Sequence, residues 1–235
     1  MPEPVIASRD EWLAARKSLL AEEKAHLRRS DELAAKRRAL PRVRVEKDYR
    51  FITNGGEKSL GDLFGGYSQL IVQHFMFGPD WEQGCPSCSL WADSYDGTVV
   101  HMNQRDTGFV AVSRAPLEKL NAYRERMGWR FEWVSSLGSD FNFDFGVSAT
   151  EAQIKAGTAS YNFSETSPHG EEMPGASVFA KDPEGSVFHT YSTYARGLDP
   201  LNGMYAYLDL LPKGRDEDDL PFSMSWVRRH DEYDN

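Results

Sequence analysis

The feature that most constrains the fold is a nearly continuous apolar run within residues 69–77. Such a run is typical of a central strand covered on both faces, as in sheets packed between helices. Residues 107–113 have the same character, and residues 131–134 alternate as a shorter strand. Helical patterns are expected over about 86–101 and 116–127. Strands that alternate with helices in this way predict an α/β layer fold.

Later in the chain, two apolar runs at 178–180 and 187–191 flank Asp182-Pro183-Glu184-Gly185. This turn signal predicts an antiparallel hairpin. A short strand is also expected at 49–52, before a turn at 54–56. The central sheet should therefore be mixed, parallel at its centre and antiparallel at one edge. The long segment 136–173 is expected to be an insertion with a function or local structure of its own.

The two ends of the chain lie outside this pattern. Ser8-Arg9-Asp10-Glu11 has the form of a helix capping box, and it predicts an amphipathic helix over 9–28. Ser30 is expected to cap a second helix, about 31–39. After a helix over about 200–211, the end from Gly214 is acidic and then aromatic, which indicates an arm. Extensions of this kind could wrap a neighbouring subunit, and a homodimer is expected.

Charge and hydropathy exclude several classes of function. The formal net charge of −9 argues against nucleic acid or an anionic membrane as the main partner. No stretch approaches the ~18 apolar residues of a membrane span. The N-terminus shows no signal-peptide pattern, so a cytoplasmic location is expected. Two cysteines spaced C-x-x-C are rarely a structural disulfide in that compartment.

The strongest chemical motif is Cys85-Pro86-Ser87-Cys88, which follows the central strand and opens a helix. The unpaired amides and dipole at a helix N-terminus stabilise a thiolate, which lowers the pKa of the first cysteine. Cys85 could then attack a disulfide, and Cys88, one turn later, could resolve the mixed disulfide. Pro86 suits the first helical position. Trp81 would supply an aromatic wall near the thiols. Two buried unpaired cysteines and a metal site are the alternatives.

Several segments resemble the thioredoxin-like superfamily and, within it, the peroxiredoxin-like branch. They include the central strand, the loop 77–88 and residues 110–116, 126–129, 135–136 and 140–142. The chain looks like a bacterial group described only as thioredoxin-family proteins of unknown function. The resemblance implies a thioredoxin-like domain over 48–212. A helical N-terminal extension, 1–47, and a C-terminal arm, 213–235, would flank it.

The resemblance also implies details of the site. A cis-proline precedes the strand beside the cysteines in this superfamily, so Pro174 is expected to be cis, to face Cys85 and to shape the substrate groove. Peroxiredoxins carry a threonine three residues before the reactive cysteine, where this chain has Glu82. Glu82 should also raise the pKa of Cys85, so dithiol chemistry is favoured over peroxide reduction. Ser87 can hydrogen-bond a thiolate and change the redox poise.

Other residues have a functional and a structural interpretation. Arg114 follows a buried strand and could pair with a thiolate or a substrate anion, or lie on the surface. His74 is expected to be a core histidine with one hydrogen bond. His169 could join both cysteines in a soft-metal site. A set of aromatic residues could line a substrate pocket or belong to the core: Trp129, Trp133, Phe141, Phe143 and Phe145.

The sequence therefore predicts a thiol-disulfide oxidoreductase that needs no cofactor. Its partners would be a thiol or disulfide substrate, or a redox partner protein, with no nucleic acid and no membrane. One alternative is a copper-type metal-binding or delivery protein that uses Cys85, Cys88 and His169. The other is a thioredoxin-fold scaffold without catalysis.

Overall fold

The computed structural model describes residues 5–164, 168 and 170–234. The chain divides into two compact units, Met1–Pro41 and Arg42–Asn235. In the first unit the helix α1 (Arg9–Arg38) begins with the expected capping box, in which the Glu11 carboxylate accepts from the Ser8 amide at 2.8 Å. The expectation of two helices is wrong, since Ser30 lies inside α1. No proline interrupts the segment before Pro41, and helix-forming residues continue on both sides of Ser30.

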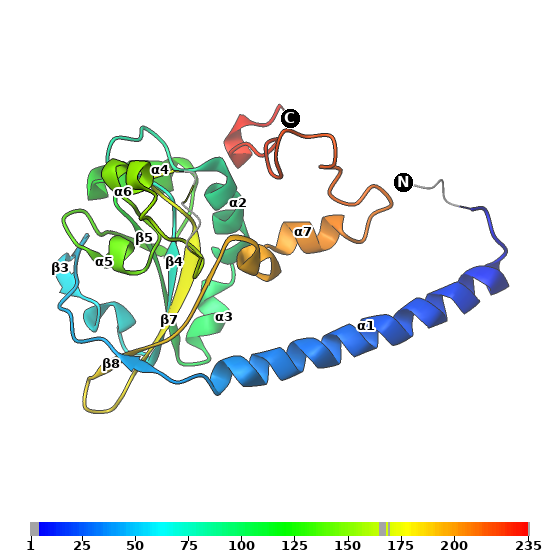
Figure 1. Ribbon diagram of the computed structural model, residues 1–235, viewed down its shortest axis with the longest axis horizontal. Helices are drawn as coiled ribbons and strands as arrows, with labels where there is room; N and C mark the ends of the chain where they lie inside the picture. Colours follow the sequence, from blue (N-terminus) through cyan, green and yellow to red (C-terminus); the bar gives the residue numbers. More distant parts are fainter. Residues whose placement is uncertain (1–4, 165–167, 169, 235) are drawn as a thin grey trace. The chain divides into compact units, whose positions relative to one another are not determined.

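The second unit is built on one sheet, with the strand order β1-β8-β7-β4-β5-β6-β2-β3. Figure 1 shows helices on both sides of its central strands. The strands are β1 (Val43–Arg44), β2 (Arg50–Thr53), β3 (Gly56–Ser59), β4 (Gln69–His74), β5 (Thr107–Ser113), β6 (Glu132–Ser135), β7 (Gly175–Lys181) and β8 (Val187–Tyr194).

Strand directions match the expected mixed sheet at its centre and differ at one edge. β4, β5 and β6 are parallel, and β7 and β8 form the expected antiparallel hairpin beside β4. β2 and β3 form a second antiparallel hairpin at the other edge, so the sheet is antiparallel at both edges. The turn between them is the expected one, where Gly56 takes a φ of +97° that favours glycine. The pairing of β1 with β8 was not expected from its two residues.

The helices of this unit are α2 (Pro86–Tyr95), α3 (Val99–Asn103), α4 (Leu117–Arg126), α5 (Phe141–Asp144), α6 (Glu151–Ala156) and α7 (Gly203–Leu208), with 3-10 turns at Asp62–Phe64, Ala195–Leu201 and His230–Glu232. The single helix expected over 86–101 is two helices, α2 and α3, with Gly97 between them. The segment 136–173 has local structure, since it holds α5, α6 and a bridge between Ser148 and Glu172.

Side chains of the sheet alternate between two buried clusters, one on each face. Leu70 and Val72 of β4 belong to one cluster, whereas Phe75 and Phe77, which follow β4, belong to the other with Cys88. The order β8-β7-β4-β5, with β7 antiparallel to its neighbours and α2 following β4, is the thioredoxin-like arrangement that we expected. Among the described residues, no helix combines the length and apolar character that crossing a membrane requires.

Candidate functional site

The two cysteines lie where the chain passes from β4 into α2. Cys85 is the N-cap residue of α2, and Pro86 takes the first helical position. The Cys85 amide donates to the Met76 carbonyl oxygen at 3.0 Å, which fixes the residue beside the end of β4. Cys85 is half-buried, whereas Cys88 is only 3% exposed. Both are free thiols, and because Cys85 is the more exposed of the two, a reagent from solution reaches it first.

The environment moves the two thiol pKa values in opposite directions. A hydrogen bond from the Cys88 side chain, opposed by burial and assisted by the amides of Cys88 and Ser87, lowers the pKa of Cys85 to about 6. The same hydrogen bond and burial raise the pKa of Cys88, whose sulfur accepts from the Met76 amide at 3.5 Å. The Ser87 hydroxyl also favours the Cys85 thiolate. This division gives one nucleophilic sulfur and one that holds its proton.

Glu82 does not occupy the position that we expected. Its side chain is 87% exposed and pairs with Lys119 at 3.2 Å. Lys119 also donates to the Trp81 carbonyl oxygen at 2.9 Å, so it holds the loop in front of the cysteines. The pKa of Cys85 is lowered, not raised. The strongest influences on it are hydrogen bonds from the helix residues Cys88 and Ser87, which lower it, and burial, which opposes them. Trp81 packs against the buried cluster that contains Cys88.

Gly84, the residue before the nucleophile, lies in a narrow space between two rings. A Cβ atom there would be 2.7 Å from Phe75 and 2.9 Å from Tyr123. The Tyr123 hydroxyl contacts the Ser89 hydroxyl at 2.9 Å, and the Ser89 hydroxyl donates to the Cys85 carbonyl oxygen at 2.9 Å. The buried side chains of Ser89 and Tyr123 therefore hold the backbone of Cys85 in place.

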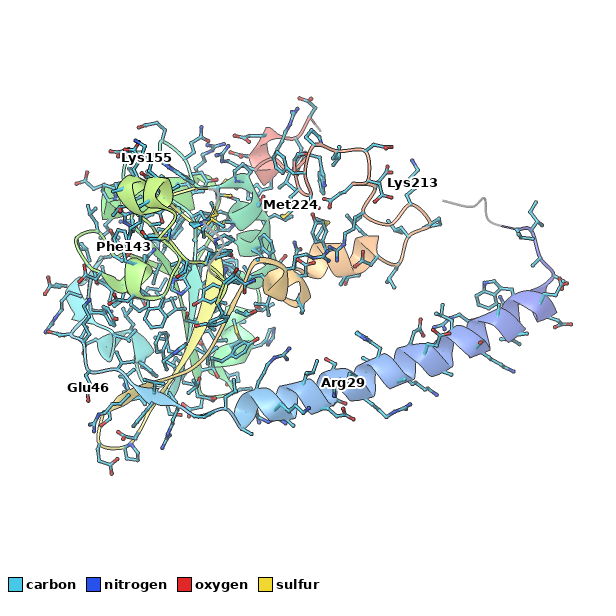
Figure 2. All side chains as sticks on the ribbon, in the orientation of Figure 1. Arg29, Glu46, Phe143, Lys155, Lys213 and Met224 are labelled. Atoms are coloured by element: carbon cyan, nitrogen blue, oxygen red, sulfur yellow. The ribbon has the colours of Figure 1, made fainter. Side chains whose placement is uncertain are left out.

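Sequence reasoning missed a third contribution, from the C-terminal segment 224–232, which we call the C-terminal clip. Met224, labelled in Figure 2, packs against the cluster that contains Cys88, and Val227 is buried. The Arg229 guanidinium donates to the Gly84 carbonyl oxygen at 2.7 Å. These two residues are 145 positions apart, so no local pattern in the sequence could have paired them.

Two further contacts attach the C-terminal clip. His230 lies 2.8 Å from the Asp93 carboxylate of α2, which also accepts from the Trp129 indole at 2.7 Å. Arg126 of α4 pairs with the clip residue Asp231 at 2.6 Å. The clip is therefore connected to both helices that flank the cysteine loop.

Arg114 does not pair with a thiolate, which was one of the roles expected for it. Its guanidinium pairs with the Glu172 carboxylate at 2.7 Å and lies over the Phe143 ring. Glu172 is only 3% exposed and also accepts from Ser148 at 2.8 Å. Burial raises the pKa of Glu172. Arg114 thus compensates a buried carboxylate inside the segment 136–173, a partner that the sequence pattern did not indicate.

The expectation that Pro174 is cis is wrong, because the described residues contain no cis peptide bond. The Met173 amide donates to the Val147 carbonyl oxygen at 2.8 Å, and the Pro174 carbonyl accepts from the Tyr161 hydroxyl at 2.6 Å. These contacts hold the trans peptide bond immediately before β7. The place of Pro174 in a substrate groove stays a prediction.

The histidines give no metal site in the described part of the chain. His74 is buried in β4 and shares one hydrogen bond of 2.8 Å with Ser177, as expected of a core histidine. His169 lies outside the described residues, so the proposed Cys85–Cys88–His169 site stays a prediction. Residues 5–164, 168 and 170–234 contain no group of three potential metal ligands of the His, Cys, Asp or Glu type.

Most of the aromatic candidates belong to the core. Trp129, Trp133 and Phe141 are buried, whereas Phe143 and Phe145 are half-buried. Phe145 lines a cavity of about 420 Å³ together with Tyr161, His189, Tyr194 and eleven other residues, which do not include either cysteine. The aromatic residues near Cys88 therefore fill space and position the helix instead of forming an open pocket.

Comparison with solved structures finds several peroxiredoxins. PrxQ of Xylella fastidiosa has 13% identity and a TM-score of 0.42, over 67% of this chain and 88% of that protein. Peroxiredoxin Q of Xanthomonas campestris has 12% identity and a TM-score of 0.44, over 67% and 90%. Peroxidoxin BcpB of Mycobacterium tuberculosis has 14% identity and a TM-score of 0.41, over 70% and 94%.

No curated protein matches the chain. A sequence profile described as "Bacterial protein of unknown function (DUF899)" matches residues 1–233. This match includes the long helix α1, the sheet with its cysteine loop, and all but the end of the segment that follows α7. The chain therefore belongs to the DUF899 family.

Proposed function

We propose that this protein is a thiol-disulfide oxidoreductase that uses Cys85 and Cys88. The observation that carries the proposal is the placement of a half-buried Cys85 at the N-cap of α2, hydrogen-bonded to a buried Cys88. A thiolate at this position is a better nucleophile near neutral pH than an ordinary cysteine. The cytoplasm, where glutathione and thioredoxin systems keep dithiols reduced, is the compartment that we propose for it.

The reaction transfers two electrons and two protons. The Cys85 thiolate attacks one sulfur of a substrate disulfide, and the other substrate sulfur leaves as a thiolate that takes up a proton. Cys88 then loses its proton and attacks the Cys85 sulfur, which releases the second substrate thiol. The products are a Cys85–Cys88 disulfide and two substrate thiols. An external dithiol, or two monothiols, must reduce the protein disulfide before the next cycle.

Two measurements test the proposal. The rate of Cys85 alkylation by monobromobimane is followed against pH, and the reduction potential of the Cys85–Cys88 pair is measured in glutathione buffers. We expect reactivity near neutral pH and a reversible disulfide, with Cys88→Ser trapping a mixed disulfide. A wild-type protein that reacts only as an ordinary thiol, or that forms no Cys85–Cys88 disulfide, would contradict the proposal.

We also propose that two copies of the chain associate through α1. None of the residues of α1 is buried, although Leu13, Leu20 and Leu27 recur at seven-residue spacing. Leucines at one position of each heptad form a narrow apolar seam, half of the a-and-d pattern of a coiled coil, which a second copy of α1 can cover. The first turn is acidic and the last turn carries Lys36, Arg37 and Arg38, so an antiparallel pair brings opposite charges together.

The oligomeric state distinguishes this arrangement from a helix that stays with its own chain. We expect a dimer by sedimentation equilibrium and a monomer for Leu20→Lys, which puts a charge into the seam. Ser18→Lys adds the same charge on the other side of the helix and should remain dimeric. A monomeric wild-type protein, or equal behaviour of the two variants, would exclude pairing through α1.

A further inference from the structure

Arg229 of the C-terminal clip makes two hydrogen bonds near the nucleophile, one to a peptide group and one to a tyrosine hydroxyl. Its Nη2 donates to the carbonyl oxygen of Gly84 at 2.7 Å, immediately before Cys85. Its Nε donates to the Tyr123 hydroxyl at 2.7 Å. The arginine side chain is only 13% exposed, and its remaining contact is with Glu232 at 2.9 Å. One guanidinium therefore serves both a backbone group and a buried phenol.

The contacts beyond Tyr123 have a fixed direction. Arginine can only donate, so the Tyr123 oxygen accepts from Arg229. The Cys85 carbonyl can only accept, so the Ser89 hydroxyl donates to it at 2.9 Å. The Tyr123 proton is then the one that lies between Tyr123 and Ser89, at 2.9 Å. Burial raises the pKa of Tyr123, which keeps this proton in place.

These contacts form one chain, from Arg229 through Tyr123 and Ser89 to the Cys85 carbonyl, while a second branch goes directly to Gly84. Arg229 therefore holds the Gly84 carbonyl directly, and it is linked to the Cys85 carbonyl through Tyr123 and Ser89. Hydrogen bonds in such a chain polarise and strengthen one another. The amides of Ser87 and Cys88 favour the Cys85 thiolate, and they act only while Cys85 keeps its place at the N-cap of α2.

We infer that Arg229 is a positioning residue for Cys85, and that the C-terminal clip supports the dithiol site through this one side chain. This inference rests on the proposed function, since it concerns the same nucleophile. Arg229 acts through the backbone, because its two donors near Cys85 are both engaged by Gly84 and Tyr123. Without Arg229, the Gly84 carbonyl loses its guanidinium donor and the Cys85 thiolate loses alignment with the helix amides.

The test is the pH profile of Cys85 alkylation in four variants, each with Cys88 present and each checked for folding by circular dichroism. Arg229→Ala should move the midpoint of the profile upward by about one pH unit, which is roughly a tenfold loss of thiolate well below the midpoint. Arg229→Lys keeps the charge but cannot form both bonds, so its shift should be intermediate. Tyr123→Phe breaks only the Ser89 branch and should give a smaller shift in the same direction.

Arg228→Ala is the matched control, because Arg228 is exposed on the same segment. It should keep the wild-type midpoint and the wild-type reduction potential. A folded Arg229→Ala with an unchanged midpoint would overturn the inference. If Arg229→Ala fails to fold, unchanged midpoints in Arg229→Lys and Tyr123→Phe would overturn the inference instead. An unreactive wild-type Cys85 would instead contradict the proposed function, so the two failures are distinguishable.

Discussion

The substitution Gly84→Ala tests the packing beneath the nucleophile. The added Cβ would lie 2.7 Å from a Phe75 ring carbon and 2.9 Å from a Tyr123 ring carbon. Neither ring can move easily, because Phe75 is 2% exposed and Tyr123 is 4% exposed. Overpacking of this kind costs about 1–3 kcal/mol, and two fixed rings place Gly84→Ala at about 2–3 kcal/mol.

That loss of unfolding free energy corresponds to a fall in Tm of about 4–12 °C for a domain of this size. Urea denaturation at neutral pH, with the thiols reduced, measures it directly. The matched control is Gly97→Ala, because no atom lies within 4 Å of a Cβ at that position. The control should be neutral or more stable by up to about 1 kcal/mol, since alanine restricts the unfolded chain.

The same substitution should also slow Cys85 alkylation, because Gly84 is the residue through which Arg229 holds the cysteine loop. The reasoning is refuted by a Gly84→Ala protein that is as stable as Gly97→Ala. It is equally refuted if Gly84→Ala is less stable but keeps the wild-type pH profile of Cys85 alkylation. The packing around Gly84 would then have no effect on the nucleophile.

Three other predictions follow from the charges. Alkylation of Cys85 should rise through a midpoint near pH 6, and Cys88→Ala, which removes the hydrogen-bond donor, should shift this midpoint upward, because the Cys88 thiol is the largest influence that lowers the Cys85 pKa. Folding favours the Cys85 thiolate, so its stabilising contribution should be present above about pH 8.5, the value of a free cysteine, and lost as the pH falls through about 6. Urea titrations that show the same pH slope for wild type and Cys85→Ser would contradict this. Arg114→Met leaves the buried Glu172 carboxylate without its cation, which should cost about 3–5 kcal/mol of unfolding free energy, whereas the double change with Glu172→Gln should recover part of it.

Much of the sheet was predictable because most of its strands have recognisable patterns in the local sequence. The apolar runs at β4 and β5 and the turn before β8 have periodicity and turn residues that depend only on neighbours in sequence. The two residues of β1 carry no such signal, because their pairing depends on β8, far along the chain. The length of α1 was underestimated because Ser30, a common cap, is also tolerated within a helix.

The candidate site was predictable only in part, because some of its contacts join residues that are far apart in the sequence. The positions of Cys85 and Cys88 follow from the order of strand, loop and helix, which is local. The partner of Arg114 is not local, because Glu172 comes 58 residues later. The Pro174 carbonyl oxygen accepts from the hydroxyl of Tyr161, which lies 13 residues earlier in the segment 136–173. Spacing and residue type contain no information about contacts of this kind.

The separation of 145 residues between Gly84 and Arg229 has a consequence for biosynthesis. A ribosome adds residues from the N-terminus, so the strands and both cysteines are made long before this arginine. Until Arg229 has been synthesised, the CPSC segment can emerge and begin to pack while the Gly84 carbonyl oxygen still lacks its guanidinium donor. The complete arrangement around Cys85 therefore forms only after Arg229 has been synthesised and has emerged from the ribosome.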